Sequence, residues 1–281
     1  MRGALCALCI LCGLPTAVAS EVRVESSFFV SSDGVRLHVL DAGPPERLPV
    51  IAFVPGWSMP AEIWRGQIES LGTRYRVAVL DPRGQGRSEI ARTGYTADRR
   101  AADIAEFVAR YPKVVLVGWS LGALESLHYV GARGEARLAG LVLVDSSVGE
   151  PPPPRGGGTF RSDLKRDRAV ALDRFVRAMF RTQRPEAELE ALARSASQLP
   201  LDASLALLAY PYPREHWRAA AHAVKVPLLY VVTPQFAEQA KNLKRNRPAT
   251  EIAVFEDAGH ALFVDESGRF DALLADFVSR L

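Results

Sequence analysis

The sequence predicts an α/β fold, a mostly parallel, doubly wound sheet that carries a helical insertion after its sixth strand. Short apolar runs rich in β-branched residues alternate with longer segments of helical periodicity, which is the order of a βαβ series. The chain has 281 residues, of which 48% are hydrophobic and 24% are charged. This composition favours one sizeable core and argues against disorder.

In the first half of the chain, the pattern predicts a hairpin and then the first core strands. Two strand-like segments lie on either side of the polar turn at residues 31–34, and we expect them to pair: residues 28–30 and 35–40. Two further strands and the helix between them are expected at residues 50–54, 60–71 and 77–80. An amphipathic helix at residues 97–110 then leads into the apolar strand that begins at Val114.

In the second half, the core strands are interrupted by a long insertion at residues 148–223. Three strands and a closing helix are expected at residues 141–144, 228–232, 252–255 and 270–281. The insertion opens with a proline-rich and then glycine-rich piece at residues 151–158. Helical patterns follow it at residues 163–182, 185–198, 202–208 and 214–221.

The segment from Val114 to Gly122 carries the strongest chemical signal in the chain. Its apolar strand ends in Gly118-Trp119-Ser120-Leu121-Gly122, and a helix-like stretch follows. Flanking glycines let a strand reverse into a helix over few residues, and the serine is then forced outward at the helix N-terminus. Free N–H groups there favour a developing oxyanion. Ser120 is therefore a candidate nucleophile, although the same residues also fit a glycine-rich turn with a surface serine.

A histidine on a loop after a late strand is the candidate base. His260 follows the expected strand at residues 252–255, on a loop that contains Gly259. Such a loop at the carboxyl edge of a parallel sheet can bring an imidazole to the serine. The other four histidines lie in strand-like or helical segments and are expected to be surface or packing residues: His38, His128, His216 and His222.

Four motifs in this order resemble those of the α/β-hydrolase superfamily, above all its single-domain esterases, non-haem perhydrolases and pimeloyl-carrier-protein methyl esterases. They resemble the oxyanion loop, the D-x-R-G-x-G-x-S turn, the nucleophile elbow and the catalytic-histidine loop, at residues 53–58, 79–88, 118–122 and 258–263. The resemblance covers nearly the whole chain after residue 20. It implies that Ser120 is the nucleophile, that His260 is the general base, and that the backbone N–H groups of Trp57 and Leu121 form the oxyanion hole.

The chain departs from the family pattern at two places. Pro55 stands where the oxyanion loop usually has a histidine, which changes the hydrogen bonding nearby but leaves the backbone donors. No aspartate follows the seventh strand, where the family usually has its third catalytic residue. Asp145, at the end of the sixth strand, is the preferred acid because some family members use that strand end. It also keeps the order serine, acid, histidine. Glu238 is the alternative, and a purely structural Asp145 is also possible.

The resemblance also gives the insertion a role. In the family this position carries a cap that roofs the active site, so we expect core residues 21–147 and 224–281 with a helical cap at 148–223. A helical decoration without that role is the alternative. Apolar cap residues would face either the core or a substrate channel: Phe175, Met179, Phe180, Leu205 and Leu208. Trp57 and Trp119, beside the nucleophile, indicate a substrate pocket with apolar walls.

Together these features predict a serine hydrolase that cleaves a small carboxylic ester through an acyl-enzyme, with no metal or organic cofactor. A cofactor-free perhydrolase or acyltransferase would use the same residues and differ only in the acceptor. A non-catalytic binding protein on a hydrolase scaffold is a further alternative, motivated by the missing aspartate after the seventh strand.

The N-terminus has the pattern of a secretory signal peptide over residues 1–20. A short positive start precedes an apolar stretch at residues 4–14 and a small-residue cleavage site. All three cysteines fall inside it: Cys6, Cys9 and Cys12. We therefore expect export to a bacterial periplasm or the medium, without stable membrane insertion after cleavage. A net charge of +3 gives no reason to expect nucleic-acid binding, and the oligomeric state stays open.

Overall fold

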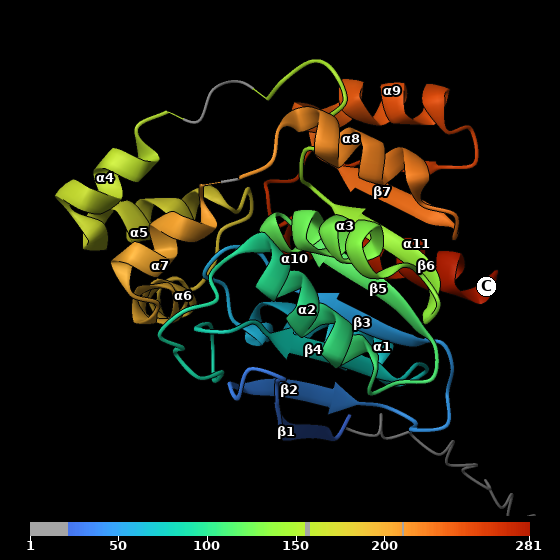
Figure 1. Ribbon diagram of the computed structural model, residues 1–281, viewed down its shortest axis with the longest axis horizontal. Helices are drawn as coiled ribbons and strands as arrows, with labels where there is room; N and C mark the ends of the chain where they lie inside the picture. Colours follow the sequence, from blue (N-terminus) through green and yellow to red (C-terminus); the bar gives the residue numbers. More distant parts are fainter. Residues whose placement is uncertain (1–21, 155–157, 210) are drawn as a thin grey trace, which may run out of the picture.

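An eight-stranded sheet forms the centre of the computed structural model (Figure 1). The structure describes residues 22–154, 158–209 and 211–281. The predicted signal peptide and its three cysteines lie outside the described residues. Within the described part, none of the helices combines the length and the apolar character needed to cross a membrane.

The strand order is β1-β2-β4-β3-β5-β6-β7-β8, which confirms the predicted fold class. The β1–β2 and β2–β4 pairs are antiparallel, and all later pairs are parallel. The strands are β1 (Val24–Val30), β2 (Arg36–Ala42), β3 (Val50–Val54), β4 (Val77–Asp81), β5 (Val114–Trp119), β6 (Leu138–Val144), β7 (Leu228–Val232) and β8 (Glu251–Val254).

Helices cover both faces of the sheet. Around the strands lie η1 (Ala61–Trp64), α1 (Arg65–Leu71), α2 (Ala97–Val108), α3 (Leu121–Arg133), η2 (Pro234–Phe236), α9 (Ala237–Asn246), α10 (Leu262–Asp265) and α11 (Ser267–Ser279). Between β6 and β7 lie α4 (Phe160–Arg166), α5 (Arg168–Ala178), α6 (Glu186–Gln198), α7 (Leu201–Leu207) and α8 (Arg214–Ala223). The helix expected at residues 163–182 is therefore divided. Asp167 is extended there, and its side chain accepts the Val170 N–H and caps α5.

The strands alternate side chains between two buried clusters, as their period of two requires. On one face, Phe53, Val117 and Val142 join a cluster that includes α1 and α11 as well as residues from α4 to α7. On the other face, Val54, Leu116 and Leu141 join a cluster with α2, α3, α8 and α9. Parallel strands that are buried on both faces have nearly continuous apolar sequences. This is why these strands could be predicted from the sequence pattern.

The helices of the insertion fall into two groups that pack in different places. Figure 1 shows α4, α5, α6 and α7 grouped together beside the sheet, whereas α8 lies with α3 and α9. Trp217, Ala220 and Ala221 of α8 are buried in the cluster on the α2–α3 face. By its packing α8 belongs with the core layer, although it lies within the range predicted as cap. We call α4 to α7 the inserted lobe.

Candidate active site

Ser120 lies at a strained turn between β5 and α3. Its φ of 56° and ψ of −120° place a non-glycine residue in a left-handed region that such residues rarely adopt. The backbone is crowded there, because a Cβ added at Gly118 would lie 2.4 Å from the Gly122 carbonyl oxygen. The Ser120 N–H donates to the Val144 carbonyl at 2.9 Å, which ties the turn to β6. The turn therefore presents the partly exposed Ser120 side chain at the N-terminus of α3.

A line of hydrogen bonds joins three of the predicted residues, which come from three different strand ends. His260 Nε2 lies 2.9 Å from Ser120 Oγ, and His260 Nδ1 lies 2.7 Å from Asp145 Oδ2. The Asp145 side chain is only 1% exposed, whereas that of His260 is 31% exposed. A serine hydroxyl, an imidazole and a buried carboxylate in this order can act as nucleophile, general base and orienting acid.

Asp145 is held at both carboxylate oxygens. Its second oxygen, Oδ1, accepts the Thr233 N–H at 2.7 Å and the Thr233 hydroxyl at 2.8 Å. Thr233 directly follows β7, at the place where the sequence lacks the expected aspartate. Asp145 itself has a positive φ of 43° after β6, which is uncommon for a residue other than glycine. The geometry thus directs a carboxylate from the sixth strand to the histidine, supported by the end of the seventh.

A buried tyrosine lies next to this carboxylate. The Tyr230 hydroxyl donates to the Ser146 carbonyl at 2.6 Å. Burial, and then the negative charges of Asp145 and Glu150, raise the pKa of Tyr230 well above its usual value. Tyr230 therefore stays a neutral hydrogen-bond donor that fixes the chain just after Asp145.

The other predicted residues lie in different surroundings. Glu238, the alternative acid, is exposed on α9 and its carboxylate lies 2.7 Å from Lys241 Nζ, so the structure does not bring it to His260. The indole of Trp119 is 1% exposed, and its Nε1 donates to the His260 carbonyl at 2.8 Å. That Trp119 lines a substrate pocket stays a prediction, since the ring supports the histidine loop from within the core.

The two predicted oxyanion donors lie on opposite sides of Ser120 in the chain. Leu121 is the first residue of α3, and Trp57 lies on the loop after β3. Within the described residues, neither backbone N–H has a recorded hydrogen-bond acceptor. The two segments pack closely, because a Cβ added at Gly56 would lie 3.0 Å from the Ser120 Cβ. Free N–H groups on both segments are what an oxyanion hole requires.

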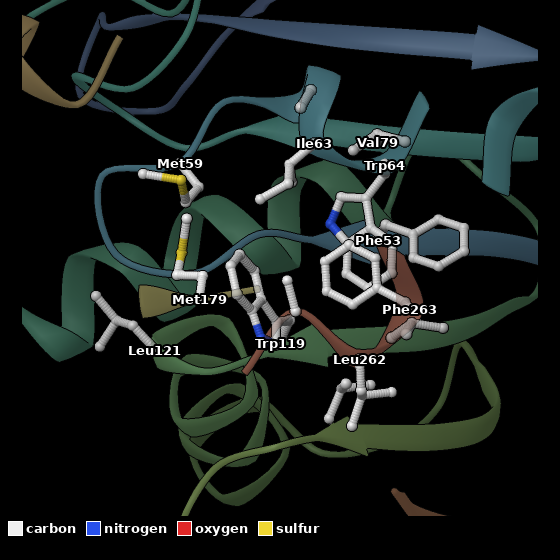
Figure 2. Close-up of a cluster of buried hydrophobic side chains, with 14 of the residues drawn as sticks. Phe53, Met59, Ile63, Trp64, Val79, Trp119, Leu121, Met179, Leu262 and Phe263 are labelled. Carbon is white, nitrogen blue, oxygen red and sulfur yellow. The ribbon is translucent and has the colours of Figure 1, made fainter. Parts of the chain in front are cut away.

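The side chain of Trp57 reaches the inserted lobe. Its Nε1 donates to the Ser204 carbonyl in α7 at 2.9 Å. Its ring meets those of Phe160 and Phe175 edge-on, at centroid distances of 5.3 and 5.2 Å. Nearby, Met59 from the loop and Met179 from the end of α5 lie in the same buried cluster, where Figure 2 draws them next to one another. Apolar side chains from core and lobe therefore meet beside the candidate site.

Asp265 holds the histidine loop in place through hydrogen bonds, and the sequence did not predict this role. We call this set of bonds the brace. Asp265 Oδ2 accepts the Gly259 N–H at 2.7 Å and the Arg181 N–H at 2.9 Å, and its Oδ1 accepts the Thr182 N–H at 3.0 Å. Burial would raise the pKa of Asp265, but these bonds and that of the Thr182 hydroxyl outweigh burial and lower it. The one available sequence signal was an acidic residue soon after the histidine, and its partners are set only by the folded chain.

Residue types that commonly bind metals are dispersed over the described part of the chain. Histidine, cysteine, aspartate and glutamate side chains form no group of three or more there that is placed to hold a metal ion. The histidines outside the site have structural partners instead. His38 Nδ1 lies 2.7 Å from Asp81, and His128 Nε2 lies 2.6 Å from Asp98.

Comparison with known proteins places the sequence in a family. The profile described as the alpha/beta hydrolase family matches residues 51–273. A non-heme chloroperoxidase from Streptomyces lividans is 37% identical over 119 residues, which are 41% of this chain and 43% of that protein. A pimeloyl-[acyl-carrier protein] methyl ester esterase from Vibrio parahaemolyticus is 27% identical over 260 residues, which are 82% of this chain and 94% of that protein.

Solved structures share the fold as well. An esterase from Exiguobacterium antarcticum superposes with a TM-score of 0.79 at 23% identity, covering 90% of this chain and 99% of that one. This likeness supports the architecture, and the profile match spans most of the sequence from β3 to α11. The chain belongs to the alpha/beta hydrolase family.

Proposed function

We propose that this protein is a serine hydrolase that cleaves carboxylic esters through an acyl-enzyme on Ser120. The observation that carries the proposal is the line from Ser120 Oγ to His260 at 2.9 Å and on to Asp145 at 2.7 Å. The strained backbone at Ser120 adds to it, because such strain recurs where a nucleophile is held outward on a sharp turn.

Each residue has a defined role in the proposed reaction. The substrate carbonyl oxygen points to the N–H groups of Trp57 and Leu121, which stabilise the negative charge that develops there. His260 takes the Ser120 proton as the hydroxyl attacks, and Asp145 stabilises the resulting imidazolium. The same proton then goes to the departing alcohol. Water, activated by His260, attacks the acyl-enzyme and releases the acid.

A small ester with an apolar portion suits the surroundings of the site. The rings of Trp57, Phe160 and Phe175 form one cluster between core and lobe. Apolar walls with a few oriented polar groups are typical of small-molecule sites. The inserted lobe acts in this proposal as the cap, and the Vibrio relative supports ester cleavage because its name is that of a methyl ester esterase.

A cofactor-free perhydrolase or acyltransferase is the second candidate, and the Streptomyces relative favours it because its name is that of a non-heme chloroperoxidase. The acyl-enzyme would be the same, and only the acceptor that attacks it would differ. Measuring how the acyl group divides between water, alcohol and peroxide distinguishes the two. Dominant transfer to water supports the hydrolase.

Labelling and turnover together test the proposal. Purified protein is treated with a fluorophosphonate and assayed on p-nitrophenyl esters of increasing chain length. We expect one label per chain, located on Ser120, and loss of hydrolysis in proportion to labelling. A folded protein that hydrolyses no ester and takes up no label would instead support a binding protein on a hydrolase scaffold.

A further inference from the structure

A buried glutamine holds the loop that carries Trp57, and the proposed reaction does not yet use it. Gln85 lies in the turn after β4 and is 1% exposed. Its Nε2 donates to the Gly56 carbonyl at 3.0 Å and to the Met59 carbonyl at 2.8 Å. The two carbonyls stand on either side of Trp57, so a single amide group connects the ends of this short loop.

The bond to Gly56 has a direct geometric consequence for Trp57. The Gly56 carbonyl and the Trp57 N–H belong to the same peptide unit, which is planar and trans. The two groups therefore point in opposite directions. Holding the carbonyl toward Gln85 sets the direction in which the Trp57 N–H points, on the far side of the peptide.

The orientation of the Gln85 amide is itself fixed. Its Oε1 accepts two N–H groups of Arg100, each at 3.2 Å. The Arg100 guanidinium can only donate hydrogen bonds, and the Gly56 and Met59 carbonyls can only accept them. Exchanging the oxygen and nitrogen of the Gln85 amide would therefore lose all four bonds. Arg100 in turn lies 2.9 Å from the carboxylate of Glu125 in α3, and both side chains are almost fully buried. Leu121 lies one turn before Glu125 on the same helix.

At its far end this loop is also anchored to β4, because the Ala61 N–H donates to the Asp81 carboxylate. Nearer to Trp57, few other polar contacts hold it to the core in the described residues. Pro55 has no N–H to donate, and within the described residues the buried Ser58 Oγ has no hydrogen-bond partner. The Gly56 carbonyl also accepts the Met59 N–H at 3.2 Å. That bond lies inside the loop and moves with it, so it does not fix the peptide relative to α3.

We propose that Gln85 is a positioning residue of the oxyanion hole: it orients the Gly56–Trp57 peptide, and through Arg100 and Glu125 it sets that peptide relative to the Leu121 N–H. The inference rests on the proposed function. Gln85 makes no contact with substrate in this account. It acts by fixing the direction of a donor that the transition state needs more than the ground state does.

Two substitutions test the role. Gln85→Met keeps the length of the side chain and removes the donor. Gln85→Glu keeps its shape and its place beside Arg100 but cannot donate to the carbonyls at alkaline pH, where a glutamate is ionised. Gln239→Met is the matched control. Gln239 is also 1% exposed, and its Nε2 donates to a loop carbonyl, that of Pro152 at 2.9 Å. Its Oε1 accepts the Ser147 hydroxyl at 2.9 Å and the Val148 N–H at 3.1 Å, so none of its bonds holds the loop that carries Trp57.

Three experiments are made on each variant at a temperature well below its Tm. Fluorophosphonate titration counts active sites, steady-state kinetics on a p-nitrophenyl ester gives kcat and KM, and a trifluoromethyl ketone gives an inhibition constant. This ketone forms a tetrahedral adduct with Ser120, so its affinity reports the oxyanion hole. Loss of stability alone would lower the number of active sites and leave kcat per site unchanged.

We expect both Gln85 variants to lose kcat per active site and ketone affinity in parallel, by about 10–100-fold, with KM changed by less than about threefold. Gln239→Met should match the parent in both. The inference is overturned if the Gln85 variants keep kcat and ketone affinity within the range of Gln239→Met. Should Gln85→Met not fold, Gln85→Glu decides alone. If the parent protein itself neither labels at Ser120 nor hydrolyses esters, the proposed function fails before Gln85 is tested.

Discussion

The strand ends of the core and the inserted lobe meet at the candidate site, but they are held together in different ways. At the strand ends, almost fully buried polar groups are joined by hydrogen bonds, as between Asp145 and Thr233 or between Gln85 and Arg100. The lobe surface carries exposed ion pairs along its helices, such as Arg177 with Asp173. Exposed pairs of this kind contribute little to stability.

The difference indicates that the strand ends and the inserted lobe have different roles in the proposed reaction. Buried, fully paired groups fix positions accurately, as the bond-making steps require. The lobe contacts the site mainly through the rings around Trp57 and through Met179, whose carbonyl accepts the Ala261 N–H at 2.8 Å. We therefore expect changes at the strand ends to act on kcat, and changes at the lobe contact to act mainly on substrate binding.

The largest effect is expected at the nucleophile. Ser120→Ala should lower kcat by about 10⁴–10⁶ while leaving the fold intact, because one member of the hydrogen-bonded line is removed and no buried group loses its partner. Steady-state hydrolysis and circular dichroism check the two halves of this prediction. Near-normal turnover by a folded Ser120→Ala protein would contradict the mechanism.

The second prediction tests which carboxylate orients His260 and stabilises its charge. Asp145→Asn is nearly isosteric, yet an amide carries no charge and can stabilise the wrong imidazole tautomer, so kcat should fall by up to about 10⁴. Glu238→Gln is the control and should leave kcat near the parent value, because Glu238 is exposed and paired with Lys241. Retention of most activity by Asp145→Asn would make this aspartate only structural.

A smaller effect is expected where the lobe meets the core. Trp57→Phe keeps the backbone N–H but removes the 2.9 Å bond to Ser204. One neutral hydrogen bond corresponds to about 1 kcal/mol, so kcat/KM should fall by about 3–10-fold, mostly through KM. If Trp57→Phe lowers kcat and not KM, the proposed division between strand ends and lobe is wrong.

The smallest effect concerns pH and the brace at Asp265. Its pKa is lower in the folded protein than the usual value of about 3.9, so the stabilisation that it provides is present above that value and is lost as the pH falls toward the folded pKa. Asp265→Asn should lower the free energy of unfolding at neutral pH by about 1 kcal/mol. The difference from the parent should shrink in acid.

Denaturant unfolding at neutral and acidic pH measures both values for Asp265→Asn. Asp276→Asn, at an exposed aspartate on α11, is the control and should change neither. A difference for Asp265→Asn that stays constant with pH would show that its carboxylate charge does not contribute.

Sequence alone predicted the fold class and placed the three hydrogen-bonded residues on the right loops. These features depend on local patterns, since continuous apolar strands and the glycine-flanked turn at Ser120 are readable over a few residues. The roles of Gln85 and Asp265 were not predicted, because their partners lie far away in the chain and are chosen by packing. The placement of α8 with the core was missed for the same reason, since its helical pattern does not say which layer buries it.

The central claim, an acyl-enzyme on Ser120, is tested most directly by trapping it. Protein mixed with a slowly deacylating p-nitrophenyl ester is quenched in acid during turnover, digested and analysed by mass spectrometry. The account predicts that the peptide containing Ser120 gains the mass of the acyl group, and that Asp145→Asn accumulates it more slowly. Turnover with Ser120 never modified, or an acyl group found on another residue, would contradict the account.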